Sequence, residues 1–125
     1  MSDAKKKILI IEDEKDIIVA LRLRLEANGY EVIAAGDGAE GLNKARTEKP
    51  SLIILDIMLP KLDGYKIARM LKFDQNFGDI PIIMLTAKVQ QSDIQRGKEA
   101  GADAYITKPF KAEELLEQIK QLLAR

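Results

Sequence analysis

Charged or hydroxyl side chains directly follow four of the five short apolar runs in this sequence. They are Glu12 and Asp13 after the first run, Asp56 after the third, Thr86 after the fourth and Lys108 after the fifth. If the first and third runs are neighbouring strands, about 4.8 Å apart, their three carboxylates crowd together. Two unit charges about 5 Å apart repel by roughly 3 kcal/mol at an effective dielectric constant of about 20. The cluster therefore needs either raised carboxyl pKa values or a bound cation.

The available side chains restrict which cation and which chemistry this cluster can support. The chain contains no His and no Cys, so the donors to a metal would all be oxygen atoms, a set that favours Mg2+ or Mn2+. A carboxylate nucleophile, a divalent cation, a hydroxyl and a Lys are the components of phosphoryl transfer. The same two absences exclude disulfides, thiolate-ligated metals and nucleophilic catalysis that depends on His.

Length and composition bound the fold and the partners. The chain has 125 residues, 46% hydrophobic and 32% charged, and we expect residues 1–125 to form one globular domain. Its 20 Lys and Arg residues balance its 20 Asp and Glu residues, so we expect no direct binding to nucleic acid. The apolar runs are far shorter than the ~20 residues that cross a bilayer, and the sequence resembles no targeting signal. We therefore expect no membrane contact and a cytoplasmic location.

The apolar runs and the stretches between them predict the elements that must position these side chains. The runs are rich in β-branched residues and do not alternate with polar ones, which is typical of strands buried on both faces of a parallel sheet. They are residues 8–11, 32–35, 52–55, 82–85 and 104–107. Helical periodicity between them predicts an α/β fold of the (βα)5 type, a three-layer sandwich with helices on both faces. Ligands of such sheets bind beyond the carboxyl ends of the strands, where the polar side chains fall.

Local signals locate the second helix. Asp37 and Glu40 have the spacing of a capping box. Gly36, Gly38 and Gly41 match the G-x-G-x-x-G pattern of dinucleotide-binding proteins, but they follow the second predicted strand and not the first. We therefore expect these glycines to serve the entry into the helix and not to bind a nucleotide.

The predicted helix over residues 90–100 is weaker than the others. Ile94 is its only sizeable apolar residue, and Gly97 in its middle costs about 1 kcal/mol relative to Ala. Two interpretations remain open, a poorly buried surface helix or an element that shifts at low energetic cost.

With these motifs in this order, the sequence resembles the receiver domain of two-component response regulators over essentially its whole length. The matching segments are Ile10–Glu14, Asp37–Leu42, Asp56–Pro60 with Asp63–Gly64, Leu85–Ala87 and Gly101–Phe110. The resemblance implies a flavodoxin-like fold with the parallel strand order 2-1-3-4-5. Within the family, the chain looks like the single-domain receivers of the chemotaxis-regulator kind.

The resemblance implies a role for each residue of the acidic cluster. Asp56 is expected to accept a phosphoryl group from the phosphohistidine of a sensor histidine kinase or of a histidine phosphotransfer protein. Asp13 and Asp56 would bind Mg2+ directly, and Glu12 would act mostly through water. The backbone carbonyl of Met58 would be a further ligand, and Mn2+ could replace Mg2+.

The remaining residues are implied to bind the phosphoryl group and to transmit its presence. Thr86 is expected to bond a phosphoryl oxygen, and Lys108 to pair with the phosphoryl charge. Tyr105 would turn inward as Thr86 moves, and the Lys108–Pro109 peptide bond is expected to be cis. The chain would thus be a phosphoacceptor and not an enzyme, one that assists its own phosphorylation and dephosphorylation. Phosphorylation would switch a surface, built on the weak fourth helix, that binds a downstream protein.

The segment around Asp103 resembles the DNA-binding winged-helix subfamily of these regulators, with two departures. Ala104 and Gln118 stand where that subfamily usually carries an acid and an Arg, although Arg96, Asp103 and Lys120 are retained. We therefore expect a monomer, or a weak homodimer through the fourth helix, fifth strand and fifth helix. The chain ends with the last predicted helix, as either a single-domain receiver or a piece of a longer regulator would, and we expect the single-domain form because the sequence begins with Met.

Two alternative functions use parts of the same residue set. A Mg2+-dependent phosphohydrolase of the haloacid-dehalogenase type would also use Asp56 as nucleophile, but it needs a second Asp where Met58 stands. A pseudo-receiver would serve only as a docking module and would not be phosphorylated. The complete acidic set and Lys108 argue against that second alternative.

Overall fold

Five parallel strands form one sheet with helices on both faces. The computed structural model describes residues 5–59, 63–87, 95–96 and 98–124. The strands are β1 (Lys7–Ile11), β2 (Glu31–Ala35), β3 (Leu52–Asp56), β4 (Ile82–Thr86) and β5 (Ala104–Thr107). All their pairings are parallel, and their order across the sheet is β2-β1-β3-β4-β5. The predicted flavodoxin-like α/β fold and its strand order are therefore confirmed.

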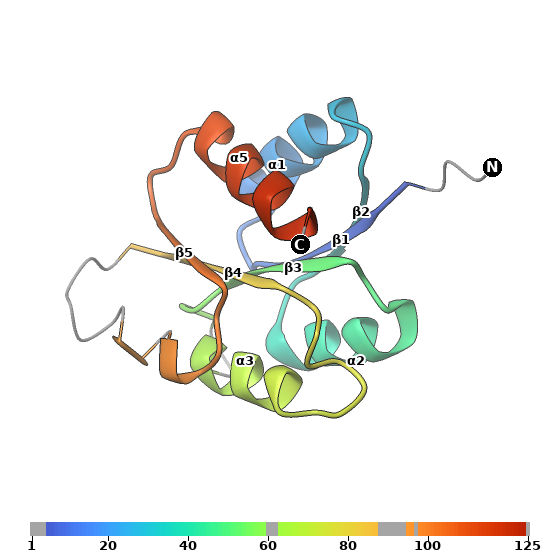
Figure 1. Cartoon of the computed structure of the whole chain (residues 1–125). Coiled ribbons are helices and arrows are strands. Elements are labelled where there is room, and N and C mark those ends of the chain that lie inside the picture. The colour runs from blue at the N-terminus through green and yellow to red at the C-terminus, as the bar shows by residue number, and fades with distance from the viewer. Residues whose placement is uncertain (1–4, 60–62, 88–94, 97, 125) are drawn as a thin grey trace.

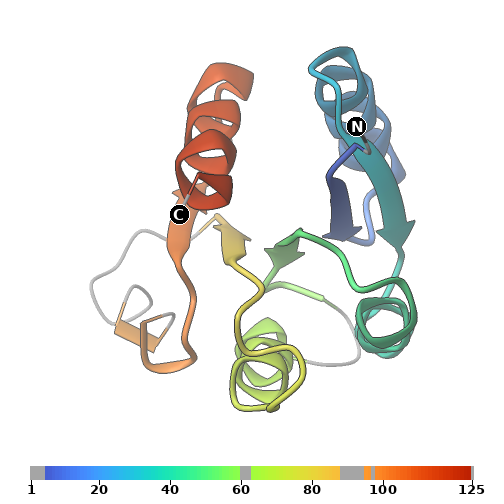
Figure 2. The same cartoon turned by 45° about the vertical axis from the view of Figure 1, so that its right-hand side comes forward.

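The helices cover the sheet in two layers. They are α1 (Lys15–Ala27), α2 (Gly38–Glu48), α3 (Gly64–Lys72) and α5 (Ala112–Leu123). In Figure 1, α1 and α5 lie above the sheet and α2 and α3 lie below it, and the rotated view in Figure 2 separates the two layers. No helix in the described part of the chain is long and apolar enough to cross a membrane.

The predicted weak helix falls largely outside the described residues, and Ile94 and Gly97 are among those left out. Gln95, Arg96, Lys98 and Glu99 are helical and exposed. Ala100, which follows them, is buried against the core on the α3 side of the sheet.

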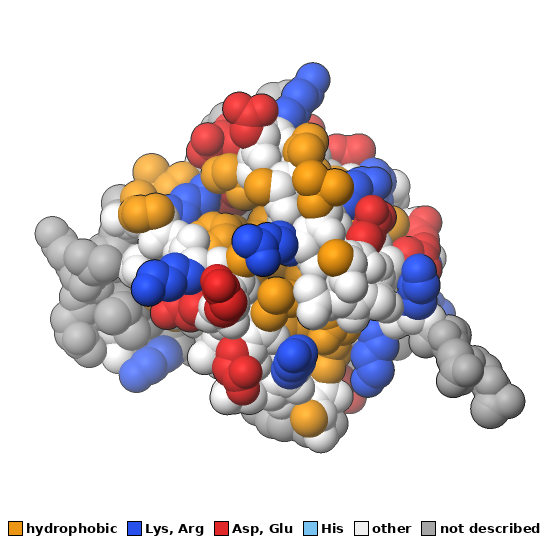
Figure 3. All heavy atoms as spheres, turned by 90° about the horizontal axis from the view of Figure 1, so that it is seen from above, with side chains coloured by type: hydrophobic (Ala, Val, Ile, Leu, Met, Phe, Trp, Pro, Cys, Tyr) orange, Lys and Arg blue, Asp and Glu red, His pale blue; other side chains and the backbone are white. Residues whose placement is uncertain are grey.

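Successive residues of each strand point to opposite faces of the sheet, and this divides the core into two clusters. Leu9, Ile53 and Met84 face α2 and α3, whereas Ile8, Ile54 and Leu85 face α1 and α5. Because both faces are covered, β1, β3 and β4 are apolar nearly throughout, and this accounts for the runs seen in the sequence. Outside these layers, over α1 and α5, acidic and basic side chains are interspersed (Figure 3).

The entry into α2 uses its glycines for capping and close packing. The Asp37 carboxylate accepts a hydrogen bond from the Glu40 N–H at 2.8 Å, and Glu40 Oε1 accepts one from the Gly36 N–H at 2.7 Å. A Cβ added to Gly41 would lie 2.6 Å from Ile11 Cδ1, so this helix packs on β1 only with glycine there. Both observations support the structural interpretation of the glycine pattern.

Candidate functional site

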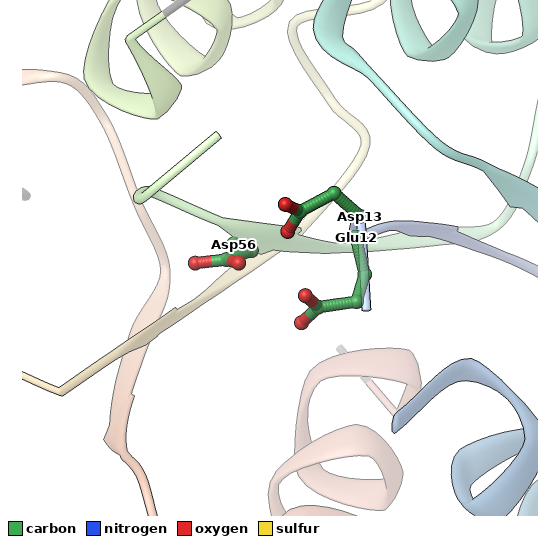
Figure 4. Close-up of side chains that lie close together, drawn as sticks. All are labelled: Glu12, Asp13 and Asp56. Atoms are coloured by element: carbon green, nitrogen blue, oxygen red, sulfur yellow. The ribbon is translucent and has the colours of Figure 1, made fainter. Parts of the chain in front are cut away.

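Three carboxylates converge where β1 and β3 end. Ile11 pairs with Leu55 across these two neighbouring strands, so the next residues, Glu12 and Asp56, lie side by side. One carboxylate oxygen from each of Glu12, Asp13 and Asp56 lies within 4.8 Å of the other two, and Figure 4 shows the three side chains close together. Glu12 and Asp56 are buried, while Asp13 is exposed. The crowding of acids predicted from the strand ends is therefore confirmed.

Lys108 supplies a positive charge to this cluster. Its Nζ lies 3.1 Å from Glu12 Oε1, 3.4 Å from Asp56 Oδ2 and 3.8 Å from Glu14 Oε1. The backbone anchors this side chain, because the Lys108 N–H donates a 2.6 Å hydrogen bond to the Thr86 carbonyl at the end of β4. The Lys108–Pro109 peptide bond is cis, as the resemblance implied.

The electrostatics of the site follow from its burial. Burial raises the pKa of Glu12 from 4.5 to about 7, and the charge of Asp56 adds to this shift. Hydrogen bonds from the Glu14 N–H, at 3.1 Å, and from Lys108 oppose it. For Lys108, burial alone would lower the pKa, but the hydrogen bond to Glu12 and the charges of Asp56 and Glu12 outweigh burial and raise it.

The loop after β3 fixes the Asp56 carboxylate from the other side. The Met58 N–H donates a 2.9 Å hydrogen bond to Asp56 Oδ1, and the Met58 side chain is 55% exposed. Asp63 caps α3 by accepting a hydrogen bond from the Tyr65 N–H at 2.9 Å. The helix then begins at Gly64, where a Cβ would lie only 2.4 Å from Ile57 Cα. The start of α3 is thus packed directly on the backbone that follows Asp56.

Thr86 and Tyr105 lie on the strands next to the cluster. Thr86 ends β4 and is buried, one position beyond Leu85, which pairs with Asp56. Tyr105 lies on β5, where it pairs with Met84. Its hydroxyl lies 3.3 Å from the Tyr65 hydroxyl, so its side-chain tip is directed toward α3 and not toward the carboxylates.

Two residues near the site were not singled out from the sequence. Glu14 contacts both Glu12 and Lys108, and its place directly after Glu12 and Asp13 was a signal that could have identified it. Tyr65 contacts Tyr105, which is 40 positions away in the chain. Nothing in the local sequence pattern around Tyr65 indicates that contact.

The donor set fits a hard divalent cation. Glu12, Asp13 and Asp56 offer only carboxylate oxygens, and they do so at the carboxyl edge of a parallel sheet. Lys108 offsets part of the negative charge but leaves the exposed Asp13 without an ion pair among the described residues. The arrangement is therefore suited to hold Mg2+ beside the Asp56 carboxylate.

Comparisons with known proteins agree with this geometry. A family model described as response regulator receiver domain matches residues 8–120. The alkaline phosphatase synthesis transcriptional regulatory protein PhoP of Bacillus subtilis is 49% identical over 120 residues, which are 96% of this chain and 49% of PhoP. The chain spans about half the length of the curated relatives that it matches.

Two solved structures show the same likeness in three dimensions. A CheY-like response regulator receiver domain protein from Methanospirillum hungatei superimposes with a TM-score of 0.90 at 35% identity, covering 97% of this chain and 95% of that one. The receiver domain of a sensor histidine kinase from Pseudomonas aeruginosa superimposes with a TM-score of 0.89 at 32% identity, covering 98% of this chain and all of that one. That structure holds a magnesium ion coordinated in its active-site cleft. The chain therefore belongs to the response regulator receiver domains of two-component signalling.

Proposed function

We propose that Asp56 accepts a phosphoryl group from the phosphohistidine of a sensor histidine kinase or of a histidine phosphotransfer protein. The observation that carries this proposal is the convergence of the buried Asp56 carboxylate with Glu12, Asp13 and Lys108 at one edge of the sheet. Asp13 and Asp56 would hold Mg2+ directly, Glu12 mostly through water, and the Met58 carbonyl would complete the protein ligands.

Each residue has a distinct part in the transfer. An Asp56 carboxylate oxygen attacks phosphorus, the bond from phosphorus to the histidine nitrogen breaks, and an aspartyl phosphate forms. Lys108, which lies 3.4 Å from Asp56 Oδ2, pairs with the transferred phosphoryl oxygens. The Thr86 hydroxyl donates a hydrogen bond to one of those oxygens. Bound Mg2+ supplies positive charge that offsets the charge of the phosphoryl group.

The consequence of phosphorylation would be a change of surface and not a chemical product. Movement of Thr86 toward the phosphoryl group would make more room for the Tyr105 ring on β5 and so favour the inward orientation of that ring. Tyr105 packs against the core cluster that contains Ala100, which follows the helical residues 95–96 and 98–99, and we expect a downstream protein to bind there. PhoP is named as a transcriptional regulator, so a partner that acts in gene regulation is the first to test.

Intact mass spectrometry after incubation with Mg2+ and acetyl phosphate tests the proposal. We expect one phosphoryl adduct on the wild-type chain and none on Asp56→Asn. Asp37→Asn provides a matched control, because it makes the same chemical change at a helix cap remote from the cluster and should leave the adduct intact. An adduct that persists on Asp56→Asn would overturn the assignment of Asp56.

A second measurement interprets a missing adduct. Some receivers accept only from their kinase or lose the group quickly, so the same samples are examined with Mg2+ and beryllofluoride by NMR. Shifts at Asp56 and Thr86 would support a phosphoryl site with a short-lived adduct. No binding of this analogue would favour the alternative of a docking module that is not phosphorylated.

A further inference from the structure

Side chains from three elements meet beside Tyr105. The Tyr65 hydroxyl lies 3.3 Å from the Tyr105 hydroxyl, which joins the first turn of α3 to β5. The guanidinium carbon of Arg96 lies 4.2 Å from the centroid of the Tyr65 ring. Arg96 Nη2 also lies 3.2 Å from Asp63 Oδ2, at the cap of α3. Tyr65 therefore contacts Tyr105 through its hydroxyl and Arg96 through the face of its ring.

The Tyr105 ring is turned into the molecule in this arrangement. It packs against the core cluster on the α3 face of the sheet, a cluster that includes Tyr65, Met84 and Ala100. Tyr65 itself is only 7% exposed, and its hydroxyl pair with Tyr105 is partly buried. The contacts that stabilise this orientation come from α3 and involve neither Asp56 nor Lys108.

We propose that Tyr65 is a positioning residue for Tyr105, and that its hydroxyl stabilises the inward orientation of Tyr105 independently of phosphorylation at Asp56. The proposal rests on the proposed function only in so far as Tyr105 is the switch residue. On this view the inward orientation has two independent stabilising contributions, the phosphorylation site on one side and the Tyr65 hydroxyl on the other. The fraction of unphosphorylated chains in which Tyr105 faces inward would then depend on its contact with Tyr65 on α3.

The two contacts of Tyr65 differ in their exposure to solvent. The Arg96 guanidinium over the ring is held by an ion pair with Asp63 whose side chains are 54% and 47% exposed, and such surface pairs contribute little. The hydroxyl pair is partly buried, although its 3.3 Å separation is long for two hydroxyl groups. We therefore expect Arg96 mainly to keep the Tyr65 ring in place, and the hydroxyl pair to determine the orientation of Tyr105.

Removing the Tyr65 hydroxyl has a predictable direction. In Tyr65→Phe, the inward Tyr105 hydroxyl loses its partner in a partly buried place, whereas an outward ring exposes its hydroxyl to water. Loss of one such hydrogen bond corresponds to a change of about twofold to tenfold in the ratio of the two orientations. The outward form should therefore increase by that factor.

The test is NMR on protein labelled with 13C at its tyrosine rings, without Mg2+ and without a phosphodonor. Side-chain couplings of Tyr105 and its contacts to the ring at position 65 report its orientation. Tyr30→Phe is the matched control, because Tyr30 packs in the cluster on the opposite face of the sheet. We expect the outward population to rise in Tyr65→Phe and to stay unchanged in Tyr30→Phe.

An unchanged Tyr105 orientation in a folded Tyr65→Phe chain would overturn the proposal. So would an equal change in Tyr30→Phe, because the effect would then be general loosening and not a contact. Thermal unfolding verifies that both variants are folded. Since no phosphoryl group is used, this outcome is independent of whether Asp56 accepts one, and the two proposals can fail separately.

Discussion

Glu12 is buried beside a second buried acid, and that position sets the pH at which it titrates. Its carboxyl has an ordinary pKa of 4.5, which the fold raises to about 7. Between these two pH values the folded chain holds a proton that the unfolded chain has released. The contribution of Glu12 to the free energy of unfolding is therefore present below pH 4.5 and is lost as the pH rises to about 7.

This pH dependence can be measured against Glu12→Gln, in which the side chain is neutral at every pH. We expect the free energy of unfolding of the wild type, relative to the variant, to fall by on the order of 2 kcal/mol between pH 5 and pH 8. Urea unfolding without Mg2+ at a series of pH values provides the measurement. A constant difference between the two proteins would show that Glu12 titrates normally in the folded chain.

Asp56 illustrates a conflict between function and stability at the same site. Its carboxylate lies beside Glu12 and Asp13, and Lys108 compensates only part of their charge. Asp56→Asn removes one of the repelling charges and keeps an oxygen that can accept the Met58 N–H. We expect the free energy of unfolding of this variant to be about 1 kcal/mol higher than that of the wild type at pH 8 without Mg2+.

The same experiment contains its own control for the role of charge. Under the proposed function Mg2+ would offset the charge of the cluster, so adding it should stabilise the wild type more than Asp56→Asn and close the gap between them. Asp37→Asn, at an exposed helix cap where Asn serves as well as Asp, should change little with or without the ion. A less stable Asp56→Asn chain would mean that the Lys108 contact outweighs the repulsion.

At the scale of elements, the contact between the start of α3 and the β3–α3 loop holds the site in place. A Cβ at Gly64 would lie 2.4 Å from Ile57 Cα and 3.0 Å from the Asp56 carbonyl oxygen. Both neighbours belong to the backbone, so Gly64→Ala requires the helix and the loop to separate. We expect a loss of about 2 kcal/mol or more in unfolding free energy, together with weaker Mg2+ binding.

Gly36→Ala is the comparison for this prediction, since its Cβ would meet only Glu40 Oε1 at an ordinary 3.8 Å. It should leave both stability and Mg2+ affinity nearly unchanged. Urea unfolding and a Mg2+ titration followed by NMR measure the two quantities. If Gly64→Ala binds Mg2+ as the wild type does, the contact with α3 does not position the ligands.

The elements themselves were largely predictable from the sequence, and their ends show where prediction stops. Burial on both faces makes β1, β3 and β4 apolar, so their apolar cores were located correctly from hydrophobicity alone. Asp56 and Thr86 were placed just beyond their strands, yet each is the last residue of one. The change to polar residues predicts the strand end before them, but the backbone pairing continues one residue further, with Asp56 opposite Leu85 and Thr86 opposite Thr107.

At the scale of the whole molecule, the two ends of the sheet carry different kinds of charge cluster. At the carboxyl end, Glu12, Asp13 and Asp56 lie close together, and Lys108 offsets only part of their negative charge. Near the other end, Lys72 Nζ lies 2.8 Å from Asp103 Oδ2, and the same oxygen accepts a 2.9 Å hydrogen bond from the Ile82 N–H. The aliphatic part of the Lys72 side chain packs against Gly101, because a Cβ on that glycine would lie only 2.8 Å from Lys72 Cγ.

The Lys72–Asp103 contact could not be predicted from the sequence, for a physical reason. Its partners are 31 positions apart and belong to no periodic pattern, so only the assembled fold brings them together. The acidic cluster, in contrast, was predictable because parallel strands place their carboxyl ends at one edge whatever the details of packing. Asp103 is therefore paired with Lys72 within the chain.

Because the two charge clusters lie at opposite ends of the sheet, we expect a substitution at Asp103 to lower stability without weakening Mg2+ binding at the acidic cluster. Asp103→Ala leaves the largely buried Lys72 ammonium and the Ile82 N–H without this acceptor, so we expect the free energy of unfolding to fall by about 2–4 kcal/mol. Asp103→Asn retains an oxygen for the N–H and should lose less. Asp79→Ala, at an exposed acid, should lose almost nothing.

Mg2+ affinity, measured on the same variants under conditions where each is folded, decides whether the ends are independent. We expect it to remain within about twofold of the wild type in all of them, because distant sites without shared partners affect each other by only a few tenths of a kcal/mol. A large loss of Mg2+ binding in Asp103→Ala would instead show that β4 and β5 transmit strain along their length from one end of the sheet to Thr86 and Lys108 at the other.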